Sequence, residues 1–114
     1  MKPTTKSISG TSFHDTTIVA SVKQIIEMCG EPSDESNTGE DKVNYEWTME
    51  TDNGNVFTIY DWKEYRPITL NERITWHIGG NSRQITEQAK LRLGILKQLS
   101  YEHNIRNTDK KNSY

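Results

Sequence analysis

The sequence predicts an α+β fold, with two helices packed on one face of an antiparallel sheet of three or more strands. Three observations predict it: a capped helical stretch over residues 21–30, three alternating apolar stretches between residues 43 and 78, and a long helical stretch after residue 81. The 114 residues match the usual size of one domain. We therefore expect a single α+β domain over residues 1–102 and a flexible C-terminal tail over residues 103–114, which lack periodicity.

The first helix follows an extended segment. Residues 7–20 are rich in Thr, Ser and Ile, which predicts one strand or two short ones. Ser21 and Gln24 have the spacing of a capping box, so the helix begins there. Its apolar positions at helical spacing are Val22, Ile25, Ile26 and Cys29. Gly30 ends the helix, and we expect the Cys29 thiol to be buried and inert.

A strongly acidic segment comes next. Residues 31–41 read EPSDESNTGED, with five acidic residues and no basic one. This composition predicts a solvated loop. The segment lacks the ligand order of a calcium-binding EF-hand, so we expect no metal site in it.

Two strands and a tight turn follow the acidic segment. Apolar and polar residues alternate over 43–49, which places Val43, Tyr45, Trp47 and Met49 on one face. Residues 52–55 read DNGN, a strong hairpin signal, and residues 56–65 form the return strand. The register of that strand stays open, because Phe57 and Ile59 lie on one face while Tyr60 and Trp62 lie on the other.

The third strand contains Ile74, Trp76 and Ile78, with Thr75 and His77 on its reverse face. The final helix is predicted from about Ser82 to about Tyr101. Its apolar stripe is Ile85, Ala89, Leu93, Leu96 and Leu99, with Leu91 and Ile95 beside it. If the helices cover both tryptophans, the opposite face of the sheet carries Glu46, Thr48, Tyr60, Trp62, Thr75 and His77, an unusual concentration of amphipathic groups.

Charge is distributed unevenly along the chain. Residues 1–52 hold ten acidic and four basic residues, a balance of −6, whereas residues 53–114 hold six acidic and ten basic residues, a balance of +4. Anionic partners are therefore expected at the second half. The excess is too small for sequence-independent nucleic-acid binding. No stretch approaches the ~20 apolar residues of a membrane span, and no apolar signal-peptide stretch occurs, so we expect a cytoplasmic protein without a membrane partner.

The junction ITWHIGGNSRQ, residues 74–84, is the first candidate binding site. Gly79 and Gly80 are expected to form a turn with exposed amide protons, followed by the unpaired N–H groups of a helix start. Arg83 can bind a phosphate with two hydrogen bonds, and Lys63 or Arg66 can approach from the neighbouring strand end. The alternative is a simple connection capped by Asn81 or Ser82.

Trp62 is the second candidate, because it can stack on a nucleobase while Lys63 neutralises a phosphate. The alternative is a core or dimer contact. Together the two candidates give one predicted set of ligand-binding residues: Tyr60, Trp62, Lys63, His77, Gly79, Gly80, Asn81, Ser82 and Arg83.

The sequence offers little support for catalysis. The three histidines lie far apart and accompany no cysteine cluster, so we expect neither zinc nor another cofactor. Ser12, His14 and Asp15 are poorly placed for a hydrolytic triad, because adjacent strand residues point to opposite faces. We expect a protein that is not an enzyme.

Four short motifs carry a resemblance: GTS at 10–12, GEP at 30–32, YDWK at 60–63 and WHIGG at 76–80. With them the chain resembles, over about residues 8–90, a small and poorly characterised family of bacteriophage and phage-related bacterial proteins. The specificity rests on the YDWK and WHIGG motifs. The resemblance implies a phage-type accessory protein, some of which counter host defence, and it implies no catalytic residues.

Two functional readings follow. The leading one is a non-enzymatic protein that binds and sequesters a small anionic, nucleotide-type ligand and so counters host defence. The alternative is an inhibitor that binds a host defence enzyme directly, in the manner of anti-CRISPR proteins. We also expect a homodimer, because two helices leave the sheet face with Tyr60 and Trp62 uncovered.

Overall fold

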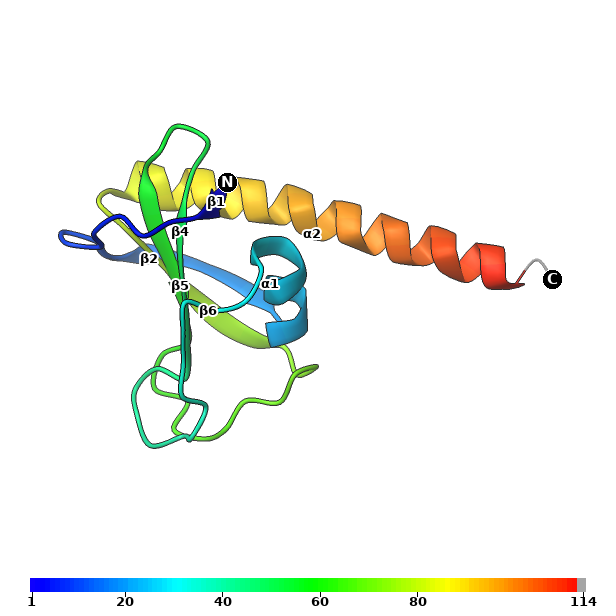
Figure 1. Cartoon of the computed structure of the whole chain (residues 1–114), viewed down its shortest axis with the longest axis horizontal. Coiled ribbons are helices and arrows are strands. Elements are labelled where there is room, and N and C mark those ends of the chain that lie inside the picture. Colours follow the sequence, from blue (N-terminus) through cyan, green and yellow to red (C-terminus); the bar gives the residue numbers. More distant parts are fainter. Residues whose placement is uncertain (113–114) are drawn as a thin grey trace.

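The fold is an antiparallel sheet with two helices on one face, as predicted (Figure 1). The computed structural model describes residues 1–112, with side chains described up to Leu99. Its elements are β1 (Lys2–Pro3), β2 (Ser12–Ala20), α1 (Val22–Cys29), β3 (Asp34–Glu35), β4 (Tyr45–Glu50), β5 (Val56–Tyr60), β6 (Ile74–Gly80) and α2 (Arg83–Asn112). The strand order is β1-β4-β5-β6-β2, and β3 also pairs with β4.

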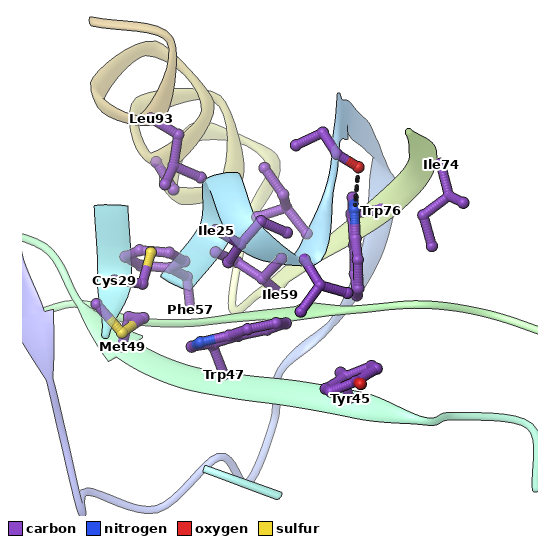
Figure 2. Close-up of a cluster of buried hydrophobic side chains, with 14 of the residues drawn as sticks. Ile25, Cys29, Tyr45, Trp47, Met49, Phe57, Ile59, Ile74, Trp76 and Leu93 are labelled. Carbon is purple, nitrogen blue, oxygen red and sulfur yellow. Dashed lines mark hydrogen bonds between the residues drawn. The ribbon is translucent and has the colours of Figure 1, made fainter. Parts of the chain in front are cut away.

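Two tryptophans form the centre of the core. Trp47 and Trp76 are fully buried and meet edge to face, with ring centroids 5.5 Å apart. Each indole N–H donates a 2.8 Å hydrogen bond to a backbone carbonyl beside α1, from Trp47 to Gly30 and from Trp76 to Ala20 (Figure 2 shows the second bond). Aromatic N–H groups are buried at low cost only when they have such partners. The predicted burial of both tryptophans is confirmed.

Helix α1 forms as its sequence predicts. The Ser21 hydroxyl accepts a hydrogen bond from the Gln24 backbone N–H, and the Gln24 side chain accepts one from the Ser21 N–H, which completes the capping box. Gly30 ends the helix with a φ of 83°. Cys29 is buried, and burial raises the pKa of its thiol to about 12, so the thiol stays protonated at neutral pH.

The hairpin of β4 and β5 settles the open register. Trp47 pairs with Ile59 and Met49 with Phe57, so these apolar side chains face the helices and Tyr60 faces the other side. The predicted length of the return strand is wrong, because β5 ends at Tyr60 rather than Tyr65.

Two strands depart from expectation. Residues 7–20 contain one long strand, β2, whose pairing with β6 is interrupted by a bulge between Phe13 and Thr17, where Asp15 has a φ of 65°. The acidic segment is not entirely loop, because β3 pairs Asp34 with Glu46 at the edge of the sheet.

The two glycines of the predicted turn lie inside β6, so that expectation is wrong. Gly79 pairs with Phe13 on β2 and Thr58 on β5, and Gly80 pairs with Ser12 and Phe57 on the same two strands. A Cβ at Gly80 would lie 3.0 Å from a Thr86 methyl group, so the absence of a side chain lets α2 approach the sheet. Close packing, not a turn, accounts for this pair of glycines.

Helix α2 is longer and less buried than predicted. It continues to Asn112 rather than ending near Tyr101, and it extends well past the sheet (Figure 1). Ala89 and Leu93 are buried against the sheet as expected, but Leu99 is exposed and does not join the core. The mobility proposed for 103–114 stays a prediction, and residues 113 and 114 of that tail lie outside the described residues.

Gly94→Ala is expected to stabilise the protein. Gly94 lies within α2, and an added Cβ would meet nothing within 4 Å. Alanine in a helix interior is favoured over glycine by about 0.5–1 kcal/mol, because glycine loses more backbone entropy. Urea denaturation should show this increase in the free energy of unfolding. A decrease would mean that α2 is not helical at this position in solution.

Candidate functional site

The face of the sheet opposite the helices carries two rows of side chains across the strands. One row runs from Glu46 on β4 to Tyr60 on β5 and His77 on β6. The next row contains Thr58 and Gly79. Between the rows lies a hollow of about 240 Å³, lined by Thr11, Ser12, Val43, Glu46, Thr58, Tyr60, Trp62 and Gly79.

Four rings form an aromatic cluster beside the hollow. The His77 ring stacks on Phe13 at 4.1 Å and on Trp62 at 6.3 Å between centroids, and Tyr60 meets His77 edge to face at 5.5 Å. Trp62 remains 42% exposed, so part of its ring is accessible to a partner. The cluster therefore offers partly solvated aromatic surface that a planar group can contact.

A buried carboxylate fixes the backbone that carries Trp62. Asp61 is fully buried, and its Oδ1 accepts hydrogen bonds of 2.8 Å from the backbone N–H groups of Asn44 and Tyr45. Its Oδ2 accepts a 3.0 Å bond from the Asn44 side-chain amide, which also donates to the Arg66 carbonyl. These charge-assisted bonds satisfy the buried carboxylate and hold the chain on both sides of Trp62.

Two lysines lie beside the Trp62 ring. The Lys42 and Lys63 ammonium nitrogens are 5.9 and 5.5 Å from the ring centroid. A 2.7 Å backbone hydrogen bond from the Lys63 N–H to the Lys42 carbonyl holds the two segments together, and Lys63 has a left-handed φ of 55°. Non-glycine residues adopt this conformation at a cost, so the surroundings must impose it. A stacked ligand with a negative group would meet positive charge here.

Burial shifts the pKa values of the ionisable side chains at the hollow. Burial, and then the charge of Asp34, raises the pKa of the Glu46 carboxyl. Burial, and then the Glu46 charge, raises the pKa of Tyr60, while burial lowers the pKa of His77. At neutral pH Tyr60 and His77 are therefore uncharged. Glu46 is the hydrogen-bond acceptor with the greatest capacity among the residues that line the hollow.

Gly79 forms the floor of the hollow. A Cβ at this position would lie 2.6 Å from the Thr58 hydroxyl oxygen and 3.5 Å from the Tyr60 ring. Any side chain here would fill the space. Gly79 is thus a site residue because it leaves room, not because its amide is exposed.

The predicted binding residues divide into two groups. Tyr60, Trp62, Lys63, His77 and Gly79 come together around the hollow. Gly80, Asn81, Ser82 and Arg83 do not join them.

The pairing of the strands explains the division. Thr58 pairs with Gly79 and Tyr60 with His77, so the chain after Tyr60 runs toward the start of β6, whereas Arg83 follows its end. β6 has seven residues, so its two ends lie about 20 Å apart. Ser82 instead accepts a hydrogen bond from the Ile85 N–H, and exposed Arg83 lies 3.9 Å from Glu87. The junction behaves as a capped connection.

A serine and a histidine do meet, but not as a catalytic pair. His14 Nε2 lies 3.0 Å from the Gly80 carbonyl oxygen and 3.3 Å from the Ser12 hydroxyl. A carbonyl oxygen can only accept a hydrogen bond, so His14 Nε2 carries a hydrogen and donates a hydrogen bond to the Gly80 carbonyl oxygen. The same nitrogen therefore cannot serve as a general base toward Ser12.

The predicted set of ligand-binding residues omitted several parts of the site, among them the hollow-lining residues Thr11, Ser12, Val43 and Glu46. Phe13 joins it through the β2 bulge, and Lys42 through the loop before β4; neither position has a local signal. Asp61 did have a local signal. A carboxylate that follows a strand and faces inward needs several hydrogen-bond donors, and the Asn44 side-chain amide supplies one of these donors. Thr58 lies on the face already assigned to Tyr60.

Comparison with protein-family models, with curated proteins and with solved structures finds no match to this chain. None of the helices that the structure describes has both the length and the apolar composition of a membrane span. Among the described side chains, no three potential metal ligands gather into one group.

Asp61→Asn is expected to destabilise the fold. The amide would place an NH₂ group against a donor and remove the charge from three hydrogen bonds, which should cost roughly 2–4 kcal/mol in free energy of unfolding. The control is Asp41→Asn at an exposed position, which should change stability by less than about 0.5 kcal/mol. Urea denaturation of both variants is the measurement. Equal effects would mean that the Asp61 carboxylate does not organise this region.

Glu46→Gln is expected to stabilise the fold at neutral pH. The raised pKa means that ionised Glu46 costs stability above its folded pKa, and that the cost disappears as the pH falls through that value. Like charges opposite each other, here Glu46 and Asp34, cost about 0.2–1 kcal/mol. The gain should thus appear at pH 7, shrink toward pH 4, and be smaller at pH 7 in an Asp34→Asn background, where burial alone still raises the pKa of Glu46. A gain independent of pH would contradict this account.

Proposed function

We propose that this protein is a non-enzymatic binder of a small, planar, anionic ligand of the nucleotide type, held in the hollow beside Trp62. The observation that carries the proposal is the half-exposed Trp62 ring, packed in an aromatic cluster and flanked by two lysines. A base stacked on such a ring contributes about 1–3 kcal/mol. Lysine ammonium groups favour a phosphate beside the stacked ring.

The polar groups of the hollow suit the edge of a base. Glu46 can accept N–H hydrogen bonds, and the hydroxyls of Thr11 and Ser12 can donate or accept. A ring that presents N–H donors is thus favoured over one that presents only acceptors. Among nucleotides, guanine has the largest set of adjacent N–H donors on one edge.

The volume of the hollow limits the ligand. Enclosed pockets for drug-sized molecules have about 300–1,000 Å³. At about 240 Å³ this hollow takes one ring system, so the sugar and phosphate would lie outside, near Lys42 and Lys63. We therefore expect modest affinity and recognition of one base rather than two.

Isothermal titration calorimetry with GMP, AMP and inorganic phosphate tests this proposal. GMP should bind more tightly than AMP, and phosphate alone should bind weakly, because stacking supplies much of the affinity. Trp62→Ala should lower GMP affinity about five- to 150-fold, which corresponds to the loss of one stacked base. Tyr65→Ala, which removes an exposed aromatic ring outside the hollow, is the matched control and should bind normally.

Two further variants distinguish the hollow from the strand-to-helix junction. Lys63→Gln should weaken binding and reduce its dependence on salt, whereas Arg83→Ala should change it less than about twofold. Loss of binding in Arg83→Ala but not in Lys63→Gln would move the site to the junction. If neither nucleotide binds at millimolar concentration, the proposal is wrong.

We further propose, from the resemblance to phage-related proteins, that ligand sequestration counters a host defence that signals through a nucleotide. Expression in a bacterium with such a defence should restore phage plating. Trp62→Ala should abolish this effect and Tyr65→Ala should preserve it.

The second candidate function is direct inhibition of a host defence enzyme. The exposed aromatic side chains Phe13, Trp62 and Tyr65 and the acidic segment 31–41 favour it, because exposed aromatic groups are typical of protein interfaces. A stable complex with a purified defence enzyme, lost when the acidic residues of 31–41 are replaced by their amides, would support this function over nucleotide binding.

A further inference from the structure

Helix α2 carries an apolar stripe that nothing in the described chain covers. Leu91, Ile95 and Leu99 follow one another at intervals of four residues and are 69%, 45% and 55% exposed. The residues that border this stripe, Glu87, Lys90, Gly94 and Gln98, also belong to α2. Three exposed large apolar side chains on successive turns of one helix are typical of an interaction site.

The stripe is separate from the core contact of the same helix. Ala89 and Leu93 are buried against the sheet. Successive helical residues turn by about 100°, so Leu91 lies about 200° from Leu93 and faces away from the sheet. A helix that is apolar on two opposite sides is stable in water when both sides are covered. The sheet covers one side.

We propose that a second copy of this chain covers the other side, with the two α2 helices antiparallel and the two-fold axis at Ile95. Leu91 and Leu99 lie four residues before and after Ile95, so an antiparallel arrangement brings each Leu91 against the partner's Leu99 and the two Ile95 side chains together. Such a self-complementary patch is what a two-fold dimer needs.

Charge selects the antiparallel arrangement. Residues 83–97 contain four basic residues and one acidic residue. A parallel pair would place these segments side by side, with aligned helix dipoles. An antiparallel pair centred on Ile95 instead places residues 83–97 against residues 93–107, which hold two basic residues and one acidic residue. Repulsion between the copies is then lower.

The shape of the molecule leaves room for this contact. Helix α2 projects beyond the sheet, so a partner helix can lie along it on the side away from the sheet (Figure 1). An overlap over residues 83–107 is about 36 Å long at 1.5 Å per residue. It would bury on the order of 1,000 Å² in total, near the lower limit for specific interfaces. We therefore expect a weak dimer that forms at micromolar concentrations.

Sedimentation equilibrium between about 1 and 200 μM tests the proposal. The wild-type chain should shift from monomer to dimer, and Ile95→Glu should stay monomeric, because two carboxylates would meet at the axis. Leu70→Glu, a similar change at an exposed loop position, is the control and should dimerise normally. Circular dichroism checks that Ile95→Glu is folded. A monomeric wild-type chain at 200 μM, or a dimer lost in Trp62→Ala but kept in Ile95→Glu, would overturn the proposal.

Cysteine cross-linking tests the arrangement without disturbing the charge. Under mild oxidation Ile95→Cys should form a disulfide-linked dimer, and Leu91→Cys alone should not, because the two copies of residue 91 would lie about 12 Å apart. The double variant Leu91→Cys with Leu99→Cys should cross-link. The native Cys29 is buried and protonated, so it should not interfere. Cross-linking of Leu91→Cys alone would indicate a parallel pair and contradict the proposal.

Discussion

The two indole hydrogen bonds that tie Trp47 and Trp76 to the ends of α1 are the constraint on which the rest of the fold depends. Helix α1 has eight residues, too few for a stable isolated helix, so tertiary contacts must hold it. Trp76 bonds to the carbonyl of Ala20, just before the helix, and Trp47 to that of Gly30, just after it. Both bonds have the same length, and both start from the centre of the core. The orientation of α1 and the spacing of β4 and β6 are therefore set together.

The same constraint organises the face that carries the candidate site. Side chains alternate along each strand, so once Trp47 and Trp76 face inward, their neighbours Glu46 and His77 must face outward. The pairing of β4, β5 and β6 then places Tyr60 between them. Glu46 is held beside Asp34 although this proximity costs stability. Arrangements that oppose stability in this way are common at binding sites, where the ligand supplies the missing partner.

The fold could be predicted from the sequence wherever a pattern was local. The capping box at Ser21, the alternation from Tyr45 to Met49 and the DNGN turn each specify their own element, and all three are confirmed. Val43, predicted on the face of Trp47, lines the hollow on the opposite face instead. The two glycines of β6 misled us, because a glycine at a turn and one that permits close packing look the same in a sequence. The strand pairing of both glycines, and the short distances from an added Cβ to Thr58 or Thr86, distinguish the two cases. The site was half predicted: the outward face was identified, but contacts between distant segments, such as Lys42 with Trp62, have no local signature.

The bulge in β2 has a consequence for how this sheet can meet other chains. β2 is an edge strand, and an open edge offers unpaired amide and carbonyl groups to any extended peptide. Here Asp15, in the left-handed region, interrupts the regular strand backbone. The Lys97 ammonium group donates a 2.8 Å hydrogen bond to the Val19 carbonyl oxygen, so this acceptor is already paired. At the opposite edge, β1 and β3 are two residues each, which leaves little template for pairing. Strand addition, the route to amyloid-like growth, is thus disfavoured at both margins, and recognition of other molecules is left to side chains.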